Sequence, residues 1–505
     1  MKRNYFKYIV ACTLLTTGVA CTKDLEDINK NPNTPEYVTP DPIFTTIQMN
    51  TPGLESVRRG SIGFCMMMVQ QTATIKTDDL QGDKYLQSDN AGTTFYDTYN
   101  AQARNLSTIM ADVSKSPDNI NRYAATRIWR VLVMHRLTDL YGAIPYSKAG
   151  RGYIDNIYTP AYDSQSEIYS DMLKELDEAA QSFDVNKATY GTADVVYQGK
   201  IQQWKRLAYS LMLRLGMRLS KVDANLAQTW VKKAIAGGLM QGNEDNCKLQ
   251  HEGPNQEQSN PISYSFFKFK LVELGDIKIS KTFLNFLLQS NDPRLPVYMS
   301  LPGGNSVVAN QKGLPNGLDA NSFQAYPGGN DLSTYSTFNV GKILPLSTPS
   351  FMLTYAEVEL MLAEAAVRGW IPDNAADHYS RAVTASMQQQ SAYGVTIDQN
   401  AINGYLQSGK PFPASGTNEQ LRVINEQYWV ATFLNGIESY ANWRRSGFPA
   451  LTPVNYPGNA TSGVIPRRLT YPQSEYSDNG KSVKDAIVRQ GADTYLTRVW
   501  WDKQQ

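Results

Sequence analysis

The sequence predicts a mainly α-helical protein, with tetratricopeptide-like helix pairs as scaffold and one loop-rich face. Apolar residues recur at helical spacing in several segments of similar length, and glycines and prolines separate these segments. Long polar stretches without such periodicity lie between them. With 42% apolar and 19% charged residues, the composition is that of an ordinary globular protein.

Residues 1–20 have the features of a bacterial lipoprotein signal peptide. A basic start precedes an apolar stretch of about a dozen residues, which is too short to cross a bilayer as a helix. Small residues then lead to Cys21, although leucine is usual where Gly18 stands. We expect Cys21 to be acylated and to become the new N-terminus. A plain secreted protein with a chance cysteine is the alternative.

Residues 21–42 are expected to form a lipidated tether. The run 22–27 is acidic, and the segment 29–35 is polar and broken by prolines, so neither buries enough apolar surface to fold alone. The acidic run also resembles the signal that sends some lipoproteins to the outer face of the outer membrane.

Two regions carry the helical pairs of the scaffold, at about 120–240 and 350–390. In the first, an apolar helix is expected to stop at Gly142, and Ser164 or Ser166 is expected to cap the next helix. In the second, Thr354 is expected to cap a helix that Gly369 ends. Tetratricopeptide spacing is approximated by Gly369, Ala375, Tyr379 and Ala382.

Three loop-rich regions are predicted at about 77–100, 245–345 and 391–505. A flat aromatic ring covers the apolar face of a sugar, while neighbouring Asp or Asn groups hydrogen-bond its hydroxyls. Two loops combine these residue types, so we expect the ligand there. The alternative is that the rings only pin their loops to the scaffold. The candidate ligand-binding residues are Tyr85, Asp89, Phe95, Tyr96, Phe323, Tyr326, Asn330, Asp331, Tyr335 and Phe338.

The sequence offers little that points to catalysis. The three histidines have no companions at metal-ligand spacing, and nucleotide-binding and nucleophile motifs are absent, so we expect no enzyme, no cofactor and no metal. A net charge of +1 argues against nucleic acid. Two alternatives remain: a surface glycan-degrading enzyme using a pair among Asp78, Asp79, Asp83 and Asp89, and a helical-repeat scaffold that binds other proteins.

Several ordered fragments carry a resemblance to a known family. The stretches 25–33, 139–146, 291–295, 353–359, 433–436, 465–472 and 500–502 together resemble the shorter, divergent branch of the SusD/RagB nutrient-binding lipoproteins. The resemblance covers essentially the whole mature chain, which we treat as one SusD-like domain over 43–505. Each fragment is weak alone, but their order behind a lipoprotein leader is specific.

The resemblance implies a noncatalytic lipoprotein at the outer membrane that faces the cell exterior. Its partner would be a SusC-like TonB-dependent transporter, to which it delivers an oligosaccharide or peptide. We expect the matching motifs to be mostly structural. Trp500 and Trp501 should dock onto the scaffold, with a platform for a sugar as the alternative. Arg444 and Arg445 should pair with the helix that carries Glu357 and Glu359. Arg467 and Arg468 should tie a loop, with binding of an acidic ligand as the alternative. Cys65 and Cys247 are expected to be buried free thiols, with a bridge between them as the alternative.

Overall fold

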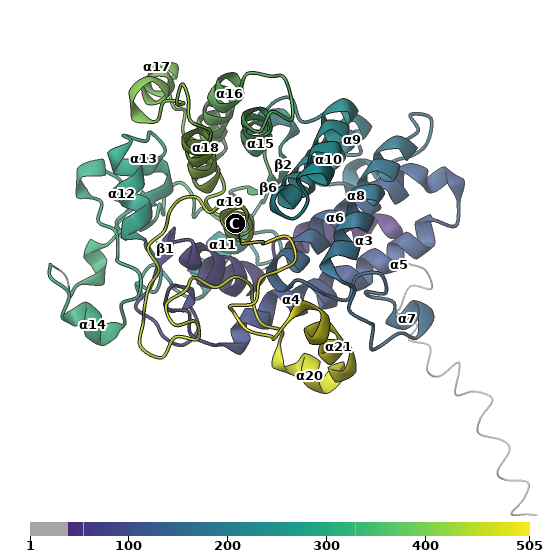
Figure 1. Ribbon diagram of the computed structural model, residues 1–505, viewed down its shortest axis with the longest axis horizontal. Helices are drawn as coiled ribbons and strands as arrows, with labels where there is room; N and C mark the ends of the chain where they lie inside the picture. The colour runs from purple at the N-terminus through teal and green to yellow at the C-terminus, as the bar shows by residue number, and fades with distance from the viewer. Residues whose placement is uncertain (1–38, 54, 329, 505) are drawn as a thin grey trace, which may run out of the picture.

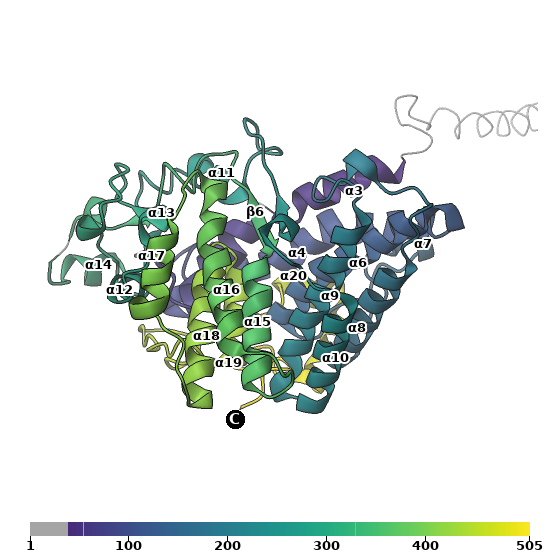
Figure 2. The ribbon, with the colours of Figure 1, turned by 90° about the horizontal axis from the view of Figure 1, so that it is seen from above.

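The computed structural model describes residues 39–53, 55–328 and 330–504. The predictions for the leader, for Cys21 and for most of the tether lie outside these residues. Within those ranges the regular structure is mostly helical, with only short two-stranded antiparallel sheets. The long helices of the scaffold run side by side across the molecule, as Figure 2 shows. The predicted mainly α-helical fold is confirmed.

The first helical block lies within the region 120–240. Consecutive helices pack against each other, and α6 ends before Gly142, whose φ of 81° stops it as predicted. Ser164 caps α8 in a capping box with Glu167. The helices of this block are α6 (Ile120–Tyr141), α8 (Gln165–Ser182), α9 (Ile201–Arg218) and α10 (Ala224–Gly237).

The second block begins at the predicted cap. Thr354 and Glu357 form a capping box at the start of α15, and Gly369 separates α15 from α16 with a φ of 70°. Tyr379 is fully buried on α16, as the tetratricopeptide spacing implies. The helices of this block are α15 (Tyr355–Val367), α16 (Ala375–Gln388), α18 (Thr417–Ala431) and α19 (Gly436–Ser446).

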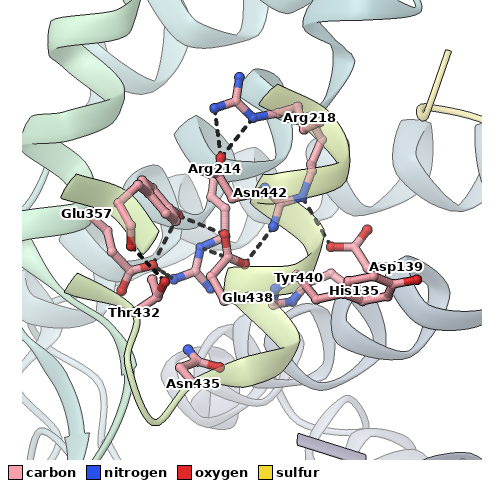
Figure 3. Close-up of polar contacts among 12 residues, drawn as sticks. His135, Asp139, Arg214, Arg218, Glu357, Thr432, Asn435, Glu438, Tyr440 and Asn442 are labelled. Carbon is pink, nitrogen blue, oxygen red and sulfur yellow. Dashed lines mark hydrogen bonds and ion pairs between the residues drawn. The ribbon is translucent and has the colours of Figure 1, made fainter. Parts of the chain in front are cut away.

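A buried ionic network joins the two blocks, and Figure 3 shows its members. Arg214 of α9 donates to Glu357 of α15 at 2.6 Å, and Arg218 donates to Glu438 of α19 at 2.6 Å. Arg218 also contacts Asp139 of α6 at 3.3 Å. Such buried charges are tolerated only when they are paired, and here the partners come from both blocks.

Shorter elements surround the blocks (Figure 1). None of the described helices is long and apolar enough to cross a membrane. The antiparallel strand pairs are β1 (Thr72–Ala73) with β3 (Lys278–Ile279), β2 (Cys247–Leu249) with β6 (Ser350–Leu353), and β4 (Met299–Ser300) with β5 (Thr337–Phe338). The remaining α-helices are α3 (Pro40–Asn50), α4 (Thr93–Asp97), α5 (Arg104–Val113), α7 (Gly152–Asp155), α11 (Pro261–Lys268), α12 (Lys281–Gln289), α13 (Leu295–Tyr298), α14 (Ala320–Gln324), α17 (Gln399–Gly404), α20 (Gln473–Asp478) and α21 (Gly480–Gln490).

Two predicted boundaries differ from the structure. The region 391–505 is not loop-rich throughout, because α18 and α19 form a helical pair in it. Buried residues on both helices explain this, since their apolar faces complete the second block. The expected tether is also too long by three residues, because α3 begins at Pro40.

The motifs expected to be structural are mostly confirmed as such. Trp501 is fully buried, and its indole N–H donates to Asp139 at 2.9 Å. Trp500 is half-buried. Arg467 and Arg468 tie the C-terminal loops to Asp502 and Asp493 respectively.

The predicted arginine pairing is right for one arginine only. Arg445 binds the helix α15 through Glu364, not through the two expected glutamates. Arg444 instead donates to the backbone carbonyls of Tyr440 and Arg467. Cys65 and Cys247 are free and buried, as expected.

Candidate ligand-binding site

The two loops expected to carry the ligand meet at an open recess of about 270 Å³. One wall comes from the segment that follows β1, and the other comes from the start of α14. A tyrosine from the C-terminal loop completes the recess. The lining residues are Ile75, Lys76, Thr77, Asp78, Asp319, Ala320, Asn321 and Tyr456.

A buried ion pair fastens the two loops together. Lys84 contacts Asp83 at 2.9 Å, and both side chains are fully buried. Lys84 also donates to the carbonyl of Thr74, and Asp83 accepts from the backbone N–H of Gly317 at 3.1 Å. The pair therefore connects the early loop to the mid-chain loop, and so holds the two walls of the recess in place.

The backbone conformation and the close packing at this junction both require glycine at position 317. Its φ is 85°, a left-handed conformation that favours glycine. A Cβ atom there would lie only 2.3 Å from Cγ1 of Val454. The C-terminal loop that carries Tyr456 can therefore approach the mid-chain loop closely only because residue 317 has no side chain.

A small apolar cluster supports the mid-chain wall. Phe323 and Tyr335 pack edge to face with their ring centroids 5.6 Å apart, and Ala73 and Leu314 complete the cluster. Ile75, which lines the recess, packs against it. The cluster is separate from the main core and packs together loops that have little secondary structure of their own.

Tyr456 and Asp319 supply the chemistry of the recess. The Tyr456 hydroxyl donates to Asp319 at 2.7 Å, and the Ser322 backbone N–H donates to the same carboxylate at 2.8 Å. Hydrogen bonds from Ser322, followed by the one from Tyr456, lower the pKa of Asp319 to about 2. An ionised, acceptor-only carboxylate beside a half-buried ring is suited to binding a sugar through its hydroxyls and its apolar face.

Five of the predicted ligand-binding aromatics are buried, which corrects the prediction. Each is at most 2% exposed and offers no free face for a sugar, because its ring is used in packing. Phe95 contacts Tyr141 and Tyr471, for example, and the OH of Tyr85 accepts from the backbone N–H of Val454. The buried residues are Tyr85, Phe95, Phe323, Tyr335 and Phe338.

The other five predicted residues are at least partly exposed, but none lines the recess. Asp89 accepts from the backbone of Gln473, and burial together with Asp89 raises the pKa of nearby Tyr96. The Tyr326 hydroxyl accepts from Lys281 at 3.3 Å. Asn330 is exposed, and Asp331 caps the turn that follows it.

The recess thus lies between the two predicted loops, but none of the predicted ligand-binding residues lines it. Of the polar lining residues, the sequence singles out Asp78 only as part of a possible catalytic pair, and it does not indicate Lys76, Asp319, Asn321 or Tyr456. Asp319 followed three residues later by Ser322 is a capping pattern, which could have marked α14. No local signal could have joined Tyr456 to this site, because it lies 137 residues from Asp319 along the chain.

The carboxylates weighed for catalysis are mostly engaged elsewhere. Asp79 contacts Arg58 and Arg59, and Asp83 is buried with Lys84. Asp78 alone among them lines the recess, with Asp319 as the other carboxylate there.

The histidines do not belong to a metal-binding cluster within the described residues. Among the described residues no cluster of three or more His, Cys, Asp or Glu is arranged to hold a metal. His135 is buried, as expected for a core histidine, and burial lowers its pKa to about 3. Its Nδ1 lies 3.1 Å from the Val131 carbonyl, whereas its Nε2 has no partner within the described chain.

Comparisons with known proteins agree with this architecture. A SusD-like family model, described as starch-binding and associating with the outer membrane, matches residues 32–472. A solved chitin-binding protein is 31% identical, with a TM-score of 0.81, and the match covers 92% of this chain and 100% of that one. No curated protein matches the chain.

Two further solved structures show the same fold. A chitin-binding SusD homologue from Flavobacterium johnsoniae is 28% identical over 92% of this chain and 98% of its own, with a TM-score of 0.74. A SusD homologue from Bacteroides uniformis is 25% identical over 93% and 100%, with a TM-score of 0.78. From its family match and these structures, the chain belongs to the SusD/RagB family.

Proposed function

We propose that this protein is a cell-surface lipoprotein, anchored through Cys21, that binds a nutrient oligosaccharide and delivers it to a SusC-like TonB-dependent outer-membrane transporter. The ligand we propose is an oligomer of N-acetylglucosamine. Two of the similar solved structures are described as chitin-binding, which favours a glycan over a peptide.

The recess beside Tyr456 is the observation that carries this proposal. It combines one aromatic ring with an ionised carboxylate and an exposed amide, Asn321, on a single open surface. Glycan sites use this combination, because the ring covers the C–H face of the sugar and the polar groups hydrogen-bond its hydroxyls. An open recess also suits a long oligomer, whose units extend beyond the bound segment.

Titration calorimetry on the protein without residues 1–21 tests ligand binding. We expect N-acetylglucosamine oligomers to bind, and Tyr456→Ala to weaken binding about tenfold, which corresponds to losing about 1.4 kcal/mol of ring contact. Tyr456→Phe keeps the ring and should retain most of the affinity. Tyr158→Ala is the matched control, since Tyr158 is 69% exposed and lies outside the recess.

Other results would contradict the binding proposal. They are selective binding of peptides, equal loss in Tyr158→Ala, or release of shortened oligomers during incubation. The last result would favour the glycan-degrading alternative.

Membrane extraction tests the anchor and the transporter. We expect the full chain to label with a fatty-acid probe, Cys21→Ser to lose the label, and a TonB-dependent barrel to co-purify with the wild-type chain in mild detergent. An unlabelled wild-type protein contradicts the anchor. A labelled protein that purifies alone supports the scaffold alternative instead of delivery to a transporter.

A further inference from the structure

A second cavity, of about 370 Å³, lies between the start of α8 and the C-terminal segment that follows α21. It shares no lining residue with the recess beside Tyr456. Its volume falls within the range of small-molecule sites and exceeds the space that a simple ion needs.

Positive charge dominates the wall of this cavity. Arg489, Arg498 and Lys503 line it, and Asp502 is the single carboxylate among the lining residues. Asp502 is 1% exposed and is already bound by Arg467 and Arg498, at 2.7 and 2.8 Å. The Lys503 side chain is exposed, and its ammonium group has no partner within the described chain. The cavity is therefore lined by more cationic than anionic side chains, and the charge of Lys503 is not paired.

The pKa of a neighbouring lysine, Lys221, reflects several charges at this end of the molecule. Lys221 lies close enough to interact electrostatically with both Asp502 and the cations around it. Burial, against the opposing charge of Asp502 and with the charges of Arg445, Arg467 and Arg498, lowers its pKa to about 8. Several cations therefore lie around Asp502 in this part of the molecule.

An unpaired acceptor and an aromatic ring line the same cavity. Gln165 is 3% exposed, and its Nε2 donates to the Thr138 carbonyl at 2.7 Å. Its Oε1 is buried with no partner in the described part of the chain, a state that costs free energy unless a donor enters the cavity. The half-buried Trp500 ring packs against Tyr169 and supplies an apolar surface.

We propose that this cavity binds an acidic sugar, a pyranose ring that carries a carboxylate or a sulfate. The anion contacts Lys503 and Arg498, the C–H face of the ring lies on Trp500, and a hydroxyl donates to Oε1 of Gln165. Charge-assisted hydrogen bonds supply the preference for an anion, and the indole supplies the preference for a ring. This site does not depend on what the recess beside Tyr456 binds.

Calorimetry with four probes tests the proposal on the protein without residues 1–21. The probes are glucuronate, N-acetylglucosamine 6-sulfate, glucose and sodium sulfate. We expect at least one acidic sugar to bind, and which of the two does so identifies the anion. Glucose and sulfate should each bind about tenfold more weakly, since each lacks one of the two interactions. Equal binding of glucose or of sulfate, or no binding of either acidic sugar, overturns the proposal.

Substitutions test whether the acidic sugar binds in this cavity. Lys503→Gln should weaken acidic-sugar binding about tenfold. Lys484→Gln makes the same charge change on an exposed α21 lysine outside the cavity, so it should have no effect. Trp500→Ala should also weaken binding, with thermal melting as a check that the protein is folded. Equal effects of the two lysine changes overturn the proposal.

Measuring each variant with both ligands distinguishes the two sites. Tyr456→Ala should leave acidic-sugar affinity unchanged, and Lys503→Gln should leave binding of N-acetylglucosamine oligomers unchanged. Loss of acidic-sugar binding in Tyr456→Ala would place that ligand in the recess and overturn the second site. Failure of the chitin oligomers to bind would contradict the proposed function only.

Discussion

Arg445 of α19 binds both carboxylate oxygens of Glu364 of α15, at 2.6 and 2.7 Å. Each side chain is 1% exposed, so the pair is removed from water. Glu364 also accepts from Arg368 and from Asn425 of α18, which makes it the point where three helices of the second block are joined. A buried charge of this kind depends on its partners, because it has no solvent to replace them.

Arg445→Met should therefore destabilise the protein by about 3 to 5 kcal/mol, because it leaves the Glu364 carboxylate buried with less compensation. Arg368→Met is the matched control. Arg368 binds the same carboxylate from a side chain that is 25% exposed, and its loss should cost about 1 kcal/mol or less. Urea unfolding measures both. Equal losses of unfolding free energy in the two variants would contradict the view that the burial of Arg445 makes its contribution larger.

A fall in pH should lower the free energy of unfolding, partly through protonation of Glu364. Arg445, followed by Arg368, holds the pKa of Glu364 well below its ordinary 4.5, despite the opposing effect of burial. A lowered pKa in the folded state gives stability that is present above pH 4.5 and is lost as the pH falls below it. Glu438, whose pKa is lowered to about 2, acts in the same direction, whereas buried Asp139, whose pKa is raised, acts against it.

Unfolding free energies from about pH 7 down to about pH 2.5 test this linkage. Glu364→Gln should be less stable than wild type at neutral pH, and its stability should fall less steeply below pH 4.5, because the titrating carboxyl is gone. Parallel curves for the two proteins would show that Glu364 does not contribute to the acid response.

Phe95 and Tyr96 are neighbours with different expected roles. Phe95 is 2% exposed among several tyrosines, so Phe95→Ala should cost about 3 to 5 kcal/mol as a large core truncation. Tyr96 is half-exposed, and Tyr96→Ala should cost about 1 kcal/mol or less. Differential scanning calorimetry compares them. A larger loss in Tyr96→Ala would mean that the burial pattern of this turn is wrong.

Cys65 and Cys247 should not react in the native protein. Both are buried, and burial raises the pKa of Cys65 to about 12 and that of Cys247 further, so almost no thiolate forms. We expect iodoacetamide to label neither thiol near neutral pH, and to label both after unfolding in guanidinium without a reducing agent. Mass spectrometry measures the label. A pair that stays unlabelled until it is reduced would indicate a disulfide.

Local signals were enough to predict much of the scaffold. Ser164 and Thr354 cap helices because a hydroxyl three residues before a glutamate satisfies free backbone N–H groups at a helix start. Gly142 and Gly369 end helices because both adopt positive φ. These effects depend only on residues a few positions apart, so a single sequence reveals them.

The same signals could not tell which aromatic rings are exposed. Phe323 and Tyr335 lie in a polar, glycine-rich stretch that looked like a binding loop, yet they form a small core of their own beneath the recess. Exposure depends on what other segments cover, and in this loop Ala73 and Leu314 close over the rings.

The sequence by itself determined the helical pairs, their caps and stops, and the two loops from which the candidate site is built. The tertiary structure decided which side chains of those loops are free, because Tyr456 reaches Asp319 only after the C-terminal loop folds back past Gly317. Helix formation depends on near neighbours along the chain, whereas a binding surface depends on segments that only folding brings together.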